Sequence, residues 1–93
     1  MIISFRCKET KKLWEGRRSK KLPHEIQDRS LRKLRQLDAS ICLDDLKNPP
    51  GNNLESLGGD REGEMSIRIN KQWRICFIWT DKGAALVEIT DYH

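Results

Sequence analysis

The last thirty residues alternate between apolar and polar side chains, and this pattern restricts the fold more than any other feature of the chain. The alternation runs through three segments, residues 64–70, 73–79 and 84–89. Successive side chains of a β-strand point to opposite faces of a sheet, so a period of two predicts three strands. Asp81-Lys82-Gly83, between the second and third segments, is typical of a tight hairpin turn. We therefore expect a three-stranded antiparallel meander.

The middle segment has the composition of an interior strand. One of its faces carries Trp73, Ile75, Phe77 and Trp79, and the other carries Arg74, Cys76 and Ile78. Both faces are largely apolar, so we expect this strand at the centre of the sheet, with a neighbour on each side. In the last segment the alternation predicts that Ala85, Val87 and Ile89 share one face.

Helical periodicity appears in the amino-terminal half. Residues 23–40 predict the clearest helix, because Pro23 suits a first helical turn and apolar side chains recur on one face. These apolar positions are Ile26, Leu31, Leu34, Leu37 and Ile41. Residues 8–15 predict a shorter helix that ends at Gly16, and the mostly apolar residues 1–5 predict a short strand.

The order of these elements predicts an α+β fold in a single domain that spans residues 1–93. We expect a small, mostly antiparallel curved sheet with the two helices packed on one face. A domain of 93 residues buries roughly 60% of the surface that its unfolded chain exposes. Such a core leaves little room for an enclosed cofactor, so an active site is expected on an open face or in a shallow groove.

The cysteines and the apolar runs exclude several classes of protein. Cys7, Cys42 and Cys76 lack the paired spacing of zinc ligands, and their odd number argues against a disulfide framework. We expect no metal and no cofactor, with Cys42 and Cys76 buried in the core. No apolar run approaches the roughly 20 residues that span a membrane. These features predict a cytoplasmic protein with no membrane partner.

Positive charge is concentrated in the amino-terminal half. Residues 1–47 contain 13 Lys and Arg against 7 Asp and Glu, whereas residues 48–93 contain 5 against 7. The densest run holds Arg17, Arg18, Lys20 and Lys21. Such a run attracts a polyanion such as RNA, DNA or an acidic protein, and it also fits a solvated loop between two helices.

Arg68 and Arg74 lie within segments that are otherwise rich in apolar residues. A charge in such a strand is costly unless it is paired, so each arginine needs a carboxylate or an anionic ligand. An ion pair with Glu64, Glu88 or Asp91 would satisfy either arginine, and so would a phosphate.

The chain ends in Asp91-Tyr92-His93, which places a carboxyl, a phenol and an imidazole directly after a predicted strand. Cleavage of RNA without a metal requires a base for the 2′-hydroxyl, a cation for the charged phosphorane and an acid for the leaving 5′-oxygen. His93 can act as base or acid, while Asp91 can orient it or act as base itself. Tyr92 can stack on a nucleobase, and Arg74 can supply the cation. We expect the tail to fold back and bring these groups together; a frayed terminus is the alternative.

Several blocks of the sequence resemble the HigB toxins, the killer proteins of plasmid-maintenance toxin–antitoxin systems in the RelE/ParE superfamily. The blocks are residues 66–70, 72–77 and 87–93, and the likeness extends through residues 48–57 and 59–63. It covers nearly the whole chain. The resemblance implies a compact sheet with two helices on one face, and a toxin that cuts messenger RNA in the ribosomal A site during translation.

The resemblance also implies partners and site residues. The partners are the ribosome, messenger RNA and a HigA-like helix-turn-helix antitoxin, through which alone the toxin would meet operator DNA. Arg74, Asp91, Tyr92 and His93 match catalytic positions of a metal-independent endoribonuclease that acts through 2′-hydroxyl attack. The residues expected to bind RNA or the ribosome are Arg17, Arg18, Lys20, Lys21, Arg61 and Arg68. The resemblance extends this expectation to Arg32 and Arg35, which would contact ribosomal RNA.

The sequence departs from some relatives at Glu55 and Gly58, where those relatives carry a His and a Lys. This departure leaves two assignments of the general base, either Glu55 or His93 working with Asp91. Two other functions on the same fold stay open, a translation inhibitor that does not cleave and a ParE-like inhibitor of DNA gyrase.

Overall fold

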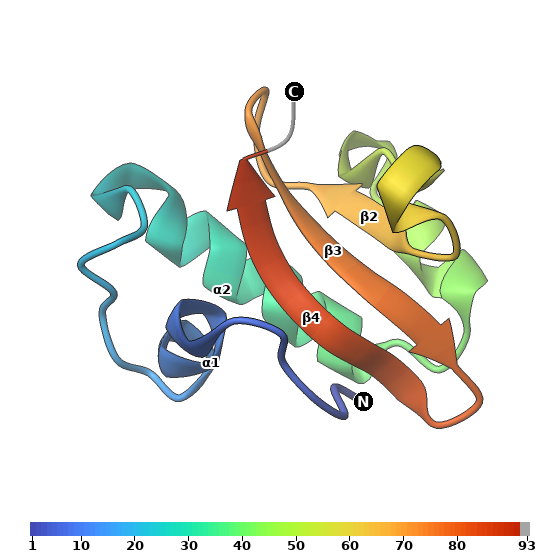
Figure 1. The fold of residues 1–93 in the computed structure, drawn as a ribbon, viewed down its shortest axis with the longest axis horizontal. Helices are drawn as coiled ribbons and strands as arrows, with labels where there is room; N and C mark the ends of the chain where they lie inside the picture. The colour runs from blue at the N-terminus through green and yellow to red at the C-terminus, as the bar shows by residue number, and fades with distance from the viewer. Residues whose placement is uncertain (92–93) are drawn as a thin grey trace.

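The computed structural model describes residues 1–91, which form two α-helices and a four-stranded antiparallel sheet (Figure 1). The helices are α1 (Lys8–Trp14) and α2 (His24–Ala39), and the strands are β1 (Glu55–Ser56), β2 (Met65–Arg68), β3 (Trp73–Thr80) and β4 (Gly83–Asp91). Short 3₁₀ turns at Leu43–Lys47, Pro50–Asn52 and Gly59–Arg61 lie between α2 and β2. The predicted α+β fold, with its helices and its meander, is confirmed.

β3 is an interior strand, as its two apolar faces predict. The strand order is β1-β2-β3-β4, and each neighbouring pair is antiparallel. Thr80 lies opposite Gly83 in the β3–β4 hairpin, so Asp81 and Lys82 form a two-residue turn of the kind that is most common in hairpins.

α2 crosses one face of the sheet and encloses the core with it (Figure 1). Leu34 and Leu37 of α2 are fully buried, and so are Ile67, Ile75 and Phe77 of the strands. The side of α2 that carries Asp28, Arg32 and Arg35 faces away from this core. α1 contacts both α2 and β4. The face of the sheet opposite α2 is therefore left for polar groups.

The chain leaves its helical path directly after α2, and two predictions about burial fail there. Ser40 has extended backbone angles, φ −72° and ψ 133°, so helical periodicity no longer sets the direction of the residues that follow. Ile41 is 91% exposed rather than part of the core. Cys42 is also exposed, whereas Cys76 is buried as predicted.

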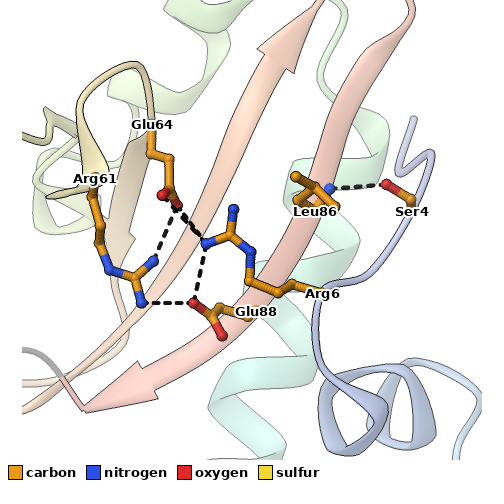
Figure 2. A network of polar contacts seen from close by, with 6 residues as sticks. All are labelled: Ser4, Arg6, Arg61, Glu64, Leu86 and Glu88. Atoms are coloured by element: carbon orange, nitrogen blue, oxygen red, sulfur yellow. Dashed lines mark hydrogen bonds and ion pairs between the residues drawn. The ribbon is translucent and has the colours of Figure 1, made fainter.

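The amino-terminal segment lies along the outer edge of β4 without forming a regular strand. It makes two isolated parallel bridges, Ile2 with Ala84 and Phe5 with Val87. Between them the N–H of Leu86 donates to Ser4 Oγ at 2.9 Å instead of to a backbone carbonyl, which interrupts the ladder (Figure 2). The fourth regular strand comes instead from β1, which pairs with β2.

A bulge at Leu86 changes which residues of β4 face the core. Cys76 pairs with Glu88 and Ile78 pairs with Ala85, so β4 contains one residue more than β3 over this stretch. Leu86 takes up the extra residue with a left-handed φ of 53°. Because an inserted residue shifts the alternation to the other face, Ala84 joins the core. The prediction that Ala85 shares the face of Val87 and Ile89 is wrong.

Candidate functional site

Arg74 lies on the face of β3 opposite α2 and is only 8% exposed. Its Nε donates to Ser66 Oγ at 2.7 Å, and its Nη2 donates to the carbonyl of Asn53 at 2.6 Å. The carboxylate of Glu55 lies 3.7 Å from the same Nη2. The sequence predicted that this strand arginine pairs with a carboxylate or an anion. The structure provides a carboxylate, but Glu55 is none of the three candidates proposed from the sequence, which were Glu64, Glu88 and Asp91.

The pairing of β1 with β2 explains this arrangement. Glu55 lies opposite Ser66, and Ser66 in turn lies opposite Cys76, two residues from Arg74 on the same face of β3. Nε and Nη2 of Arg74 are thus held by oxygens on fixed segments, while Nη1 makes no hydrogen bond to any residue within 1–91. A cation fixed in this way needs little reorganisation to stabilise a developing negative charge.

Asp91 ends β4 and is exposed. It pairs with Trp73, whereas Arg74 pairs with Thr90. Opposite residues of an antiparallel pair share a face, so Asp91 and Arg74 leave the sheet on different faces. Gln72 Nε2 donates to Asp91 Oδ2 at 2.8 Å. The carboxylate beside Arg74 is therefore that of Glu55, and the expected meeting of Arg74 with Asp91 is not observed. Tyr92 and His93 lie outside the described residues.

Arg61 belongs to a four-residue charge cluster (Arg6, Arg61, Glu64 and Glu88) on the same face of the sheet (Figure 2). Its Nη2 lies 2.7 Å from Glu88, and its Nη1 lies 3.1 Å from Glu64. The hydrogen bond to Glu88 raises the pKa of the Arg61 guanidinium. Two carboxylates neutralise two cations here, which leaves little net charge for an RNA phosphate.

Cys76 lies on the same face, and burial raises the pKa of its thiol. Since the thiolate is the reactive form, we expect iodoacetamide to label Cys42 at neutral pH and to label Cys76 about tenfold or more slowly. Mass spectrometry after short labelling of the native protein measures both rates. Labelling in denaturant is the control and should remove the difference; equal rates in the native protein would contradict the burial of Cys76.

The basic run between α1 and α2 is partly neutralised. Arg17 pairs with Glu15 and Arg18 pairs with Asp28, each at 3.1 Å. Lys20 and Lys21 are exposed. The run therefore presents fewer uncompensated charges than its sequence indicates.

A second group of cations, which the sequence only partly predicts, surrounds a pocket of about 420 Å³ between α2 and the end of β2. This basic pocket is defined by Arg29, Arg32, Lys33 and Arg68. Arg32 and Arg68 were expected to contact RNA, whereas Arg29 and Lys33 were missed. The spacing of residues 29, 32 and 33 on one helical face was the available signal.

Two classes of feature are absent from the described part of the chain. Within residues 1–91, no three His, Cys, Asp or Glu side chains gather closely enough to hold a metal ion. Over the same residues, neither helix combines the length and the apolar composition that crossing a membrane requires.

Comparison with known proteins places the whole chain among bacterial toxins. Residues 3–93 match a family model described as the RelE-like toxin of the type II toxin–antitoxin system HigB. The full chain is 40% identical to Toxin HigB-1 of Vibrio cholerae serotype O1, covering 98% of that protein. It is also 34% identical to Endoribonuclease HigB of Proteus vulgaris, covering 100% of it. A shorter match, 39% identical over 61% of this chain, is to an uncharacterized protein of Haemophilus influenzae, of which it covers 56%.

Proposed function

Because the chain belongs to the HigB family of RelE-like toxins, and such a toxin has an antitoxin partner, we propose that it is a ribosome-dependent endoribonuclease that cuts messenger RNA in the A site. The name of the Proteus vulgaris relative supports the endoribonuclease activity. The observation that carries the proposal is the fixed guanidinium of Arg74, with a carboxylate at its edge, on the face of the sheet opposite α2. We assign the antitoxin to the HigA type.

In this proposal Arg74 stabilises the pentavalent phosphorane. The 2′-oxygen attacks the adjacent phosphorus, and the bond from phosphorus to the 5′-oxygen breaks. The products are a 2′,3′-cyclic phosphate and a 5′-hydroxyl. One group must take the proton of the 2′-hydroxyl, and another must give a proton to the leaving 5′-oxygen. No metal is required for either transfer.

Glu55 is the proposed general base. Its carboxylate is 48% exposed and lies 3.7 Å from the Arg74 guanidinium, so a phosphate held by Arg74 has its neighbouring 2′-hydroxyl within reach of Glu55. His93 is the proposed acid, and Tyr92 the proposed contact to a nucleobase. Asp91 is assigned to positioning the terminal residues, since it binds Gln72 at the end of β4.

Lys20 and Lys21, with Arg17 and Arg18, are proposed to contact ribosomal RNA. Arg61 is left out of this set because its side chain is only 29% exposed and bridges two carboxylates, Glu64 and Glu88. Arg17 and Arg18 each have a single partner and are more than half exposed. Contacts of these cations with phosphates make binding to the ribosome weaken steeply as the salt concentration rises.

The proposal is tested by mapping the 5′ ends of messenger RNA in a reconstituted translation system. We expect cuts in translated messages only, and a loss of about 10²–10⁴ in cleavage rate for Glu55→Gln, the range for removal of a general base. Glu62→Gln is the matched control, because Glu62 is an exposed glutamate away from the contacts of Arg74, and it should cleave normally.

Three other outcomes of this experiment would reject parts of the proposal. Cuts in naked RNA would remove the dependence on the ribosome. Arrested translation with intact message would favour the inhibitor that does not cleave, an alternative that the absence of the relatives' His at position 55 keeps open. Normal translation combined with inhibited DNA gyrase would favour ParE-like activity.

A further inference from the structure

We infer that the basic pocket is a subsite for single-stranded RNA, which holds the backbone of the message next to the phosphate that is cut. This inference rests on the proposed function and names a second binding place for the same substrate. The phosphate and sugar of one nucleotide are the expected occupants. The base would contribute little, since the residues that line the pocket include no aromatic side chain.

The charges of the pocket are not compensated within the protein. Among residues 1–91, none of Arg29, Arg32, Lys33 and Arg68 lies within ion-pair distance of an Asp or Glu. The amino-terminal basic run differs, because its two arginines are paired. Four cations without a carboxylate give the pocket an uncompensated positive charge, and such a field favours a polyanion.

Uncharged oxygens hold three of these cations in place. Arg29 Nη1 donates to the carbonyl of Ile69 at 3.2 Å, and Arg68 Nε donates to the carbonyl of Asn70 at 3.1 Å. Lys33 donates to the side-chain oxygen of Asn52. These bonds orient the cationic groups without neutralising them, and each group keeps other N–H bonds for a ligand.

Asn52 fixes the position of the Lys33 side chain. It is fully buried, and its side-chain nitrogen donates to the carbonyls of Leu46 and Asn48, both at 3.1 Å. Burial lowers the pKa of Lys33, and the charges of Arg29 and Arg32 lower it further. A bound phosphate would relieve the repulsion among these like charges, which is a physical reason for the pocket to bind an anion.

Position favours RNA over an acidic peptide. Arg68 lies directly opposite Arg74 in the β2–β3 register, so the two side chains share a face of the sheet. Arg68 also lines the pocket. Arg68, at the end of β2, thus links the face that carries Arg74 to the α2 side of the sheet. A strand of RNA with one phosphate at Arg74 can pass Arg68 and round the end of β2 to reach Arg29 and Arg32 of α2. The volume of about 420 Å³ falls within the range of small-molecule sites and admits one nucleotide.

The test measures binding of a fluorescently labelled 2′-O-methyl RNA hexamer by anisotropy, at several salt concentrations. The methyl group blocks the nucleophile, so the probe cannot be cut. We expect Arg32→Glu to weaken binding about tenfold or more, as for removal of a charged hydrogen bond. The steepness of log K against log salt should fall by about 0.7 for each phosphate that the variant no longer neutralises.

Lys82→Glu is the matched control. Lys82 is exposed in the β3–β4 turn and outside the pocket lining, and the substitution changes the net charge equally. β3 runs from Arg74, which lies opposite Arg68, to Thr80 just before Lys82, a length of roughly 20 Å. It should alter affinity no more than about twofold, because salt screens charges beyond roughly 8 Å. Neither Arg32 nor Lys82 is buried, so both variants should have the melting temperature of the wild type.

Three results would overturn the inference: equal weakening by Arg32→Glu and Lys82→Glu, no saturable binding by the wild-type protein, or equally effective displacement of the hexamer by polyglutamate of matched charge. The last result would assign the pocket to an acidic protein segment. Because the probe cannot be cleaved and no ribosome is present, these results are independent of the translation assay. The inference about the pocket and the proposal of messenger RNA cleavage can therefore be rejected independently of each other.

Discussion

Replacement of Phe77 by alanine should lower the free energy of unfolding by about 3–5 kcal/mol, the range for removing a fully buried aromatic ring. Phe77 is 0% exposed and lies in the core shared by the sheet and α2. Its ring meets that of Trp79 edge to face, with the centroids 6.4 Å apart. Small domains are stable by only about 5–15 kcal/mol, so this variant should be marginally folded.

Urea unfolding followed by tryptophan fluorescence measures this change in stability. Ile78→Ala is the matched control, because Ile78 is the next residue of β3, points to the other face and is half-buried. Its free energy of unfolding should fall by about 1 kcal/mol, in line with a typical partly buried position. Similar values for the two variants would mean that the α2 side of the sheet is not the dominant core.

Replacement of Arg74 by lysine should reduce messenger RNA cleavage by about 10²–10³-fold, the cost of removing one preorganised donor. Lysine keeps the positive charge, but it lacks the planar fork that binds Ser66, Asn53 and a phosphate at once. Stability should fall as well, by about 1–3 kcal/mol, because Ser66 Oγ is buried and is left without its donor.

Cleavage during translation and urea unfolding, measured on the same preparations, separate the two effects. Arg6→Lys is the control, since Arg6 is an arginine of the charge cluster that does not contact Arg74. It should be somewhat less stable and keep full cleavage. If Arg74→Lys cleaves at the wild-type rate, Arg74 is a structural residue and the proposed chemistry is wrong.

The sequence contains enough information to predict the main elements of the fold, because their signals are local. Strict alternation predicts β2, β3 and β4, and helical periodicity together with Gly16 predicts α1 and α2. β1 has only two residues, which is too short for a period to appear. The bulge was not predictable either. Leu86 has a left-handed φ, and leucine is a residue type that rarely adopts this conformation.

The partners of the site residues were harder to predict because they depend on contacts between distant segments. Glu64 and Glu88 were reasonable partners for a strand arginine, but Arg6 and Arg61 approach from other segments and occupy them. That leaves Glu55 for Arg74. In the same way, the helical cations of the basic pocket are visible in the sequence, whereas the opposing Arg68 is brought there by the fold.

The bridged amino-terminal segment has a consequence for how another chain can bind. Residues 1–6 exchange backbone hydrogen bonds with Ala84 and Val87 at 2.8–3.0 Å, and a Cβ on Gly83 would come within 2.1 Å of the carbonyl oxygen of Met1. The open side of β4 is thus already occupied along this stretch. An incoming peptide cannot lengthen the sheet there by β-augmentation unless it first displaces the start of the toxin.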